Sequence, residues 1–286
     1  MNQPSRRLDR GKREYWERRA KLLFSYPVPP PLRPADSDIA LYASWVRMRA
    51  SSLGGQAFNV AVLGVTRAIA AMPWPVGADI LALDWSHTAA RKLWPSGSAP
   101  RGSNVAIADW RELPLPDGSM DLAIGDTCYS AMSSREDSAR LHEEVARVSK
   151  PGAWWIQRCF VRPEMPDRVD LLFSELETRR ISAFEIFCFR LAMALQRDRD
   201  EGVRCGDVWK EWTRRVHEPA LLLQDLSWNP GSLAFIDRWK DEDARLYFPS
   251  MSDIRDLVRP DFEIIETRFP DYEMGECCPM IVLQRN

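Results

Sequence analysis

Residues 60–68 read VAVLGVTRA, and residues 80–85 read ILALDW. Each stretch is a short apolar run, which ends at Gly64 in the first case and at Asp84 in the second. A buried strand, a tight turn and, about 20 residues later, a strand that ends in a carboxylate form the general layout of nucleoside-cofactor sites. The pattern G-x-G-x-x-G is absent, so no pyrophosphate cradle is indicated, which counts against NAD or FAD.

The same alternation of short apolar runs with polar or helical stretches extends over residues 58–160. A helix is predicted over 135–149, because Lys150-Pro151-Gly152 is a strong stop signal. Strands that alternate with helices indicate βαβ units and a parallel sheet, so the expected fold class is α/β. The predicted strands of this region are 60–63, 80–83, 105–108, 122–124 and 153–160.

The flanking regions differ in pattern from this core. Residues 1–56 form an N-terminal helical extension, with helices expected over about 10–24 and 37–50. Residues 161–259 are mostly helical and form an insertion, whereas 260–286 return to strand character at 263–269 and 280–284. The link between these two strands is too short for a crossover helix, so they are expected to be antiparallel and to complete the sheet of a core that begins at residue 57. The helices expected in the insertion are 181–197, 207–216 and 252–257.

Composition excludes several classes of protein. The 286 residues are 45% hydrophobic and 28% charged, with a net charge of −2, which is typical of a globular domain and counts against a dedicated nucleic-acid binder. No apolar run approaches the roughly 20 residues of a membrane span. Three histidines and six cysteines without a CxxC indicate no metal site. The start of the chain has no apolar signal region, so reduced thiols in the cytoplasm are expected.

Further motifs follow the third and fourth predicted strands. Residues 107–110 read IADW, and a carboxylate and an indole at this position suit the amine and the face of a purine. Residues 113–122 read LPLPDGSMDL, and residues 144–152 read EVARVSKPG.

In these motifs the chain resembles the class I S-adenosylmethionine (SAM)-dependent methyltransferase family, over residues 58–160 and the terminal strand pair. The family typically has an acid after strand two, an acid after strand three, the passage LPxPDxSFDxV and the turn ExxRVLKPGG. Asp84, Asp109, 113–122 and 144–152 stand at these places. The resemblance implies a Rossmann-like, seven-stranded, mostly parallel sheet with helices on both faces, an antiparallel strand near the C-terminus, and SAM as cofactor.

The first motif departs from the family pattern, in which an acid precedes G-x-G-x-G. Here Val62 takes the place of the acid, and Thr66 and Ala68 take the places of the later glycines. Asp126 at the end of strand four is expected to accept from the ammonium group of SAM instead. The altered motif also allows another use of SAM, such as aminobutyrate transfer or cyclisation, or a non-catalytic partner subunit.

The resemblance implies roles for individual residues. Asp84 is expected at the ribose and Asp109 with Trp110 at the adenine, with Trp85 beside it; as alternatives, Asp84 is a helix N-terminal acid and Asp109 a turn former. The full set of expected cofactor residues is Gly64, Val65, Thr66, Asp84, Trp85, Asp109, Trp110, Asp126 and Thr127.

Methyl transfer mainly needs alignment of nucleophile and methyl group, so few residues are candidates for catalysis. Tyr129 is the candidate for positioning a nucleophile. Arg158 is expected either to bind a substrate carboxylate or to join a structural ion pair. Cys128 is interpreted as a small buried hydrophobe rather than a nucleophile.

The leading interpretation is a methyltransferase of a small molecule, which the insertion 161–259 encloses as a helical lid. The aromatic residues of the insertion either form its own core or line the substrate pocket. No nucleic-acid partner is expected, because the acidic balance, the absence of an Asn/Asp-Pro-Pro-Tyr/Phe tetrad and the lid count against macromolecular substrates. No membrane partner is expected, because no apolar run is long enough to span a bilayer.

Overall fold

The structure is a computed structural model that describes residues 13–18, 28–92, 94 and 103–286. Its centre is a seven-stranded sheet with the order β3-β2-β1-β4-β5-β9-β8. The first five strands are parallel, and β9 is antiparallel to both β5 and β8. This order confirms the predicted fold class and the antiparallel terminal pair. The strands are β1 (Phe58–Leu63), β2 (Ala78–Asp84), β3 (Asn104–Ile107), β4 (Met120–Asp126), β5 (Ser149–Arg158), β8 (Phe262–Arg268) and β9 (Met280–Arg285).

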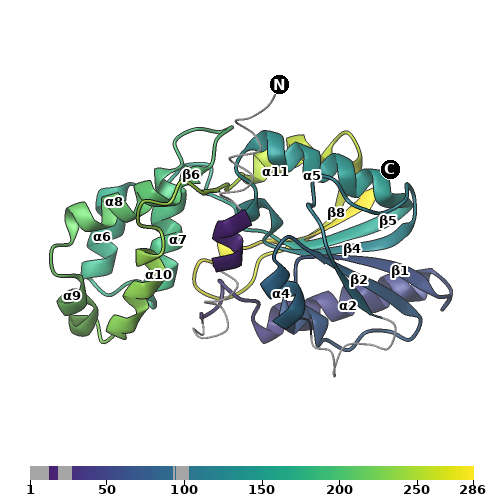
Figure 1. Ribbon diagram of the computed structural model, residues 1–286, viewed down its shortest axis with the longest axis horizontal. Coiled ribbons are helices and arrows are strands. Elements are labelled where there is room, and N and C mark those ends of the chain that lie inside the picture. Colours follow the sequence, from purple (N-terminus) through teal and green to yellow (C-terminus); the bar gives the residue numbers. More distant parts are fainter. Residues whose placement is uncertain (1–12, 19–27, 93, 95–102) are drawn as a thin grey trace.

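Helices cover both faces of the sheet (Figure 1). On one face lie α2 (Asp36–Ser52), α3 (Arg67–Ala70) and α4 (His87–Lys92), and on the other α5 (Arg135–Val148) and α11 (Met251–Val258). Strand β4 is buried along almost its whole length, as a central strand covered on two sides must be. Parallel strands with helices on both faces bring their carboxyl ends to one edge, where ligands of such sheets bind.

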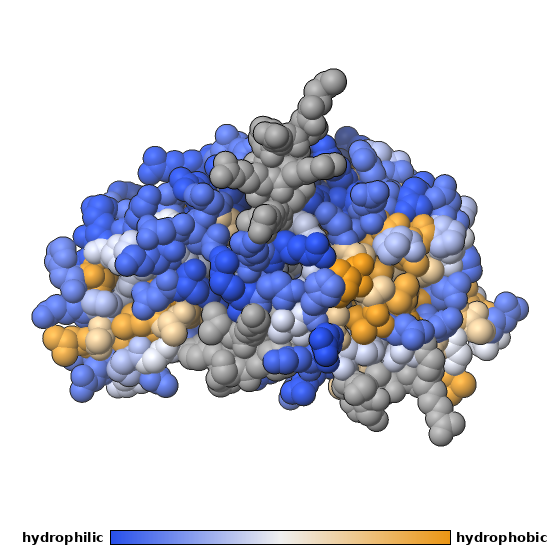
Figure 2. All heavy atoms as spheres, viewed as in Figure 1, coloured by the Kyte–Doolittle hydropathy of each residue, from blue (hydrophilic) through white to orange (hydrophobic). Residues whose placement is uncertain are grey.

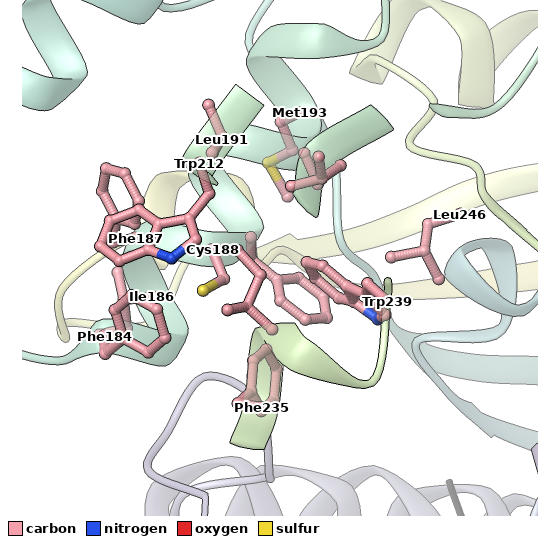
Figure 3. Close-up of a cluster of buried hydrophobic side chains, with 14 of the residues drawn as sticks. Phe184, Ile186, Phe187, Cys188, Leu191, Met193, Trp212, Phe235, Trp239 and Leu246 are labelled. Atoms are coloured by element: carbon pink, nitrogen blue, oxygen red, sulfur yellow. The ribbon is translucent and has the colours of Figure 1, made fainter. Parts of the chain in front are cut away.

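The insertion between β5 and β8 forms a separate helical lobe beside the sheet lobe (Figure 1). Its aromatic residues pack against one another: the ring centroids of Phe184 and Trp212 are 5.0 Å apart, and those of Phe235 and Trp239 are 5.6 Å apart (Figure 3). These residues therefore form the lobe's own core. Its elements are α6 (Val169–Glu177), α7 (Phe184–Leu195), β6 (Val203–Arg204), α8 (Cys205–Arg215), α9 (Pro219–Asp225), α10 (Leu233–Asp237) and β7 (Arg245–Leu246).

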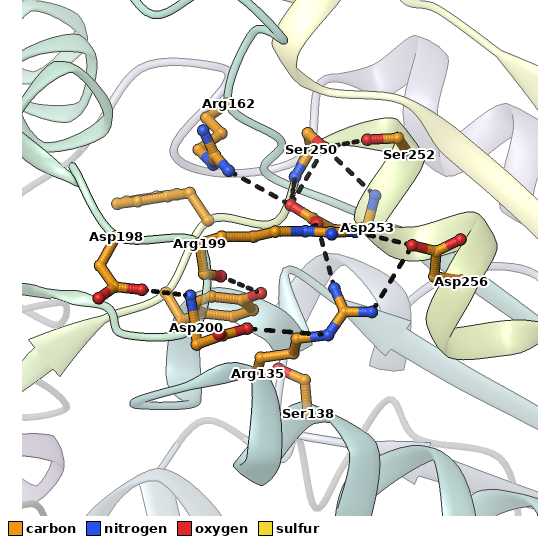
Figure 4. Close-up of polar contacts among 12 residues, drawn as sticks. Arg135, Ser138, Arg162, Asp198, Arg199, Asp200, Ser250, Ser252, Asp253 and Asp256 are labelled. Carbon is orange, nitrogen blue, oxygen red and sulfur yellow. Dashed lines mark hydrogen bonds and ion pairs between the residues drawn. The ribbon is translucent and has the colours of Figure 1, made fainter.

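An ion-pair network joins the helical lobe to the start of α5 and α11 (Figure 4). At its centre is Asp253, which is 1% exposed and pairs with Arg135, Arg162 and Arg199. Burial alone would raise the pKa of Asp253, but hydrogen bonds from Ser250 and Arg199 hold it below its usual range. Asp253 also caps α11, since it accepts from the backbone N–H of Ser250 at 2.9 Å.

A short N-terminal helix, residues 13–18, lies between the two lobes (Figure 1). Glu17 accepts from the backbone N–H groups of His87 and Thr88 at the start of α4. On the other side, the Tyr15 hydroxyl accepts from Trp239 Nε1 at 3.1 Å, and Arg18 pairs with Glu242. The rest of the helix predicted over 10–24 lies outside the described residues.

Polar side chains cover most of the face seen in Figure 2, while apolar ones gather over part of the sheet lobe and near α9. Among the described residues, no helix combines the length and the apolar character that crossing a membrane requires.

Candidate functional site

A cavity of about 320 Å³ lies at the carboxyl edge of the parallel strands. Its lining comes from the ends of β1, β2 and β4, from the loop after β3, and from an N-terminal segment. This segment contributes Trp16, Val28, Leu32, Arg33 and Pro34. The sequence predicted nine cofactor residues on four separate loops, and all nine line this one cavity. They are Gly64, Val65, Thr66, Asp84, Trp85, Asp109, Trp110, Asp126 and Thr127.

The turn after β1 is built around Gly64. Its φ of +94° is a backbone conformation that residues other than glycine rarely adopt. The Trp110 ring packs directly on it, since a Cβ at this position would lie 3.3 Å from the ring. The indole N–H of Trp110 donates to Leu83 O at 2.7 Å, which fixes the ring as part of the wall.

Asp84 ends β2 at the mouth of this turn. One carboxylate oxygen accepts from Val65 N at 2.9 Å and the other from Ser86 N at 2.7 Å. Burial raises the pKa of Asp84 despite these hydrogen bonds. The carboxylate is thus held rigidly between the β1 and β2 loops, and each oxygen keeps lone pairs for a further donor.

Asp109 belongs to a charged group in the loop after β3, next to the end of β2. Arg111 pairs with it at 2.7 Å, reaches Asp137 at 2.8 Å, and lies 5.3 Å from the Trp85 ring centroid. Asp109 therefore faces the cavity with its charge balanced. The predicted role at an adenine remains a prediction.

Asp126 and Thr127 form the end of β4. Asp126 Oδ1 accepts from Arg158 Nε at 2.8 Å, and Oδ2 accepts from Thr66 Oγ1 at 3.3 Å. Thr127 has a φ of +58°, which is a strained backbone for a β-branched residue. Such strain gathers at functional sites, where the surrounding structure holds it in place.

Arg158 does not line the cavity, which corrects the expectation that it binds a substrate carboxylate. Its side chain is fully buried and is held by Asp126 and by Pro31 O, to which Nη1 donates at 2.5 Å. Asp38 lies 3.9 Å away. Of the two alternatives, the structure favours the structural ion pair, and Arg158 ties the N-terminal segment to the end of β4.

Tyr129 does not line the cavity either, so its hydroxyl is not placed to position a nucleophile there. It is fully buried, accepts from Gln157 Nε2 at 3.0 Å and lies 2.7 Å from His142 Nε2. The β4 end turns at Thr127, so the next side chains point into the core under α5. Cys128 is buried as expected, and burial raises the pKa of its thiol.

The cavity is covered by a part of the chain other than the predicted lid. None of its described lining residues belongs to 161–259. The cover consists of Trp16, Val28, Leu32, Arg33 and Pro34, with Ala131 and Met132 after β4. The sequence showed Trp16 only as part of an apolar helical stripe, which did not distinguish a cavity wall from ordinary packing.

Comparisons with known proteins agree with this architecture. Residues 63–156 match the family model described as a methyltransferase domain. No curated protein matches.

Solved structures match over nearly the whole chain at low identity. Magnesium protoporphyrin IX methyltransferase from Synechocystis PCC 6803, solved with bound SAH, is 11% identical with a TM-score of 0.53, covering 96% of this chain and 98% of that one. N-methyltransferase NodS from Bradyrhizobium japonicum, solved with S-adenosylhomocysteine, is 8% identical with a TM-score of 0.51, covering 94% and 97%. A structure described as a putative Zn-dependent alcohol dehydrogenase from Rhodobacter sphaeroides is 14% identical with a TM-score of 0.55, covering 96% and 98%.

At these identities the solved structures show the fold alone. The sheet lobe of this chain therefore has the Rossmann-like fold of methyltransferases, and residues 63–156 within it match a methyltransferase domain.

Proposed function

We propose that this chain is a SAM-dependent methyltransferase of a small molecule, which binds between the strand ends and the N-terminal segment. One observation carries the proposal: nine residues predicted for the cofactor from four separate loops line a single cavity. That cavity lies at the strand edge where ligands of this fold bind.

The residues present fit the cofactor. SAM supplies a methyl group that is already activated on a sulfonium, so the protein has to bind and align rather than activate. Gly64 allows the left-handed backbone of the first turn, and the rigid Asp84 carboxylate suits the two ribose hydroxyls. Trp85 and Trp110 offer flat surfaces for a purine.

A cavity of this size favours a small acceptor over a protein or nucleic-acid chain. It is closed by the N-terminal segment, not by the helical lobe, which instead supports that segment through Tyr15 and Arg18. Tyr129 is buried outside the cavity, and alignment of the acceptor with the methyl group is the main task of the protein.

The test is titration with S-adenosylhomocysteine by calorimetry, for the wild type and for Asp84→Ala. Losing a hydrogen bond to a charged acceptor costs roughly 1.5–3 kcal/mol, so the variant should bind roughly 10- to 150-fold more weakly. Asp79→Ala, an exposed acid on the same strand, is the control and should bind like the wild type. Unchanged affinity in Asp84→Ala would refute the ribose role, and no binding to the wild type would favour a non-catalytic scaffold.

A second use of SAM is favoured by one feature. The Asp126 carboxylate already accepts hydrogen bonds from Arg158 and Thr66, and Val62 stands where the family usually has an acid. The aminobutyrate arm of SAM would therefore be held differently from the family pattern. Incubation with SAM alone separates the two reactions: cyclisation of the aminobutyrate arm releases methylthioadenosine without any acceptor, whereas methyl transfer needs one.

A further inference from the structure

The two walls of the cavity differ in charge, and this difference bears on the acceptor that the proposed function leaves unnamed. The strand-end wall carries three carboxylates, those of Asp84, Asp109 and Asp126, against one guanidinium, that of Arg67. The second wall, which we call the facing wall, is the cover of the cavity. It is apolar apart from Arg33, and its described residues include no carboxylate; they are Trp16, Val28, Leu32, Arg33, Pro34, Ala131 and Met132. A cationic cofactor suits the first wall, while a second cation on the facing wall would meet a like charge.

The Arg33 guanidinium lies along the facing wall. Its Nε donates to Val28 O at 3.0 Å and its Nη1 to Pro34 O at 3.4 Å, and both of these residues line the cavity. No carboxylate of the described residues is within ion-pair distance of Arg33. Among the described residues its other donors have no hydrogen-bond partner, so they can reach a ligand, and a planar guanidinium matches a carboxylate.

Trp16 supplies the aromatic surface of the same wall. The helix that carries it is held on the sheet side by Glu17, through two backbone N–H groups of α4, and on the lobe side by Tyr15 and Arg18. Burial works against the charge of Glu17, yet hydrogen bonds from Thr88 and His87 hold its pKa below the usual range. By binding the start of α4, Glu17 fixes the position of the neighbouring Trp16.

From these observations we propose that the acceptor is a small, flat, largely apolar molecule with a carboxylate. Its ring lies against Trp16 and its carboxylate pairs with Arg33, so that its nucleophile faces the strand-end wall. Arg33 and Trp16 are then the residues that determine specificity.

Three fragments of similar size and different charge test this: benzoate, benzamide and benzylamine. Each is titrated into protein saturated with S-adenosylhomocysteine, and binding is followed by ligand-observed NMR. The expected order is benzoate, then benzamide, then benzylamine, with benzoate ahead by roughly tenfold for one charge-assisted pair at an accessible site. Equal binding of the three fragments, or a preference for benzylamine, would overturn the proposal.

Variants locate the anion. Arg33→Gln should remove the preference for benzoate, Arg33→Lys should keep part of it, and Trp16→Ala should weaken benzoate and benzamide alike. If the preference is lost in Arg67→Gln but kept in Arg33→Gln, the anion lies on the cofactor wall and the proposal is wrong.

The cofactor is the other possible source of a carboxylate for Arg33. If Arg33→Gln weakens S-adenosylhomocysteine but not methylthioadenosine, Arg33 binds the cofactor and the proposal for the acceptor fails. Saturation with S-adenosylhomocysteine distinguishes failure of the proposed function from failure of the acceptor proposal. If S-adenosylhomocysteine does not bind at all, the proposed function is contradicted, and the acceptor class is not.

Discussion

The two lobes are both rich in tryptophan, and one pair from each lobe shows two different uses of this residue. In the sheet lobe, Trp85 and Trp110 line the cavity beside Asp84 and Asp109. In the helical lobe, Trp212 and Trp239 are almost fully buried among phenylalanines. The residue type is the same in both places. The neighbours distinguish the site from the core, because the strand ends place carboxylates beside the tryptophans of the site.

Substitution of a tryptophan in the core of the helical lobe should give the largest effect on stability and none on cofactor binding. Trp212→Ala should lower the free energy of unfolding by about 3–5 kcal/mol, because it opens a cavity among packed rings. Cofactor affinity of the folded protein should stay unchanged. Chemical denaturation and calorimetry measure the two quantities.

The half-buried Trp209 on the same helix is the matched control. It contacts Lys240 and Asp237 near the surface, so Trp209→Ala should cost well under half as much. An equal loss for both variants would show that the lobe's stability does not rest on the buried cluster.

The junction between the lobes gives the next largest effect. Asp253→Asn removes the buried charge that three arginines share, and about 3 kcal/mol of stability should be lost. Asp256→Asn, in the same network but half exposed, should change stability by less than about 1 kcal/mol. Similar losses, measured by urea denaturation, would mean that the network acts through the exposed pairs.

Much of the fold was predictable from the sequence, because most strands of the core are apolar runs bounded by turn residues. The exception is β5, which begins at Ser149 and includes the Lys150-Pro151-Gly152 that was predicted as a turn. The ends of β1, β2 and β4 follow directly from Gly64, Asp84 and Asp126, and these residues meet wherever parallel strands share an edge. The side chains after such an end were not predictable in the same way. At β4 the chain turns through the left-handed Thr127, and Tyr129 is thereby directed into the core.

The cover of the cavity was also not predictable. A helical insertion of this length suggested a lid, but its many apolar residues pack on one another before they can cover anything else. The N-terminal segment reaches the cavity because Arg158 binds Pro31 O and because Glu17 and Tyr15 bridge the lobes. Such long-range contacts leave no periodic signal in the sequence.

The core cluster under α5 makes the sheet lobe sensitive to acid. Burial lowers the pKa of His142 from 6.5 to about 3, so the unfolded chain binds a proton that the folded chain does not. Stability is therefore complete above pH 6.5 and falls as the pH drops toward 3, by about 2 kcal/mol at pH 5. His142→Gln should remove that part of the pH dependence in denaturation curves between pH 5 and 7.5. A slope equal to that of the wild type would mean that other groups cause it.

The smallest expected effect tests how the altered first motif holds the cofactor. Val62 cannot accept a hydrogen bond, and the nearest acid on β4 is Asp126, whose carboxylate lies at the cavity between Thr66 and Arg158. Arg158 is itself flanked by Asp38 at 3.9 Å, so the three buried groups keep one net negative charge for an ammonium group. Asp126→Asn should weaken S-adenosylhomocysteine by roughly tenfold, which is about 1.4 kcal/mol, and should leave its analogue without the amino group nearly unaffected. Calorimetry with both ligands on the same variant also controls for any loss of packing around Arg158. Equal weakening of the two ligands would show that Asp126 serves the fold rather than the ammonium group.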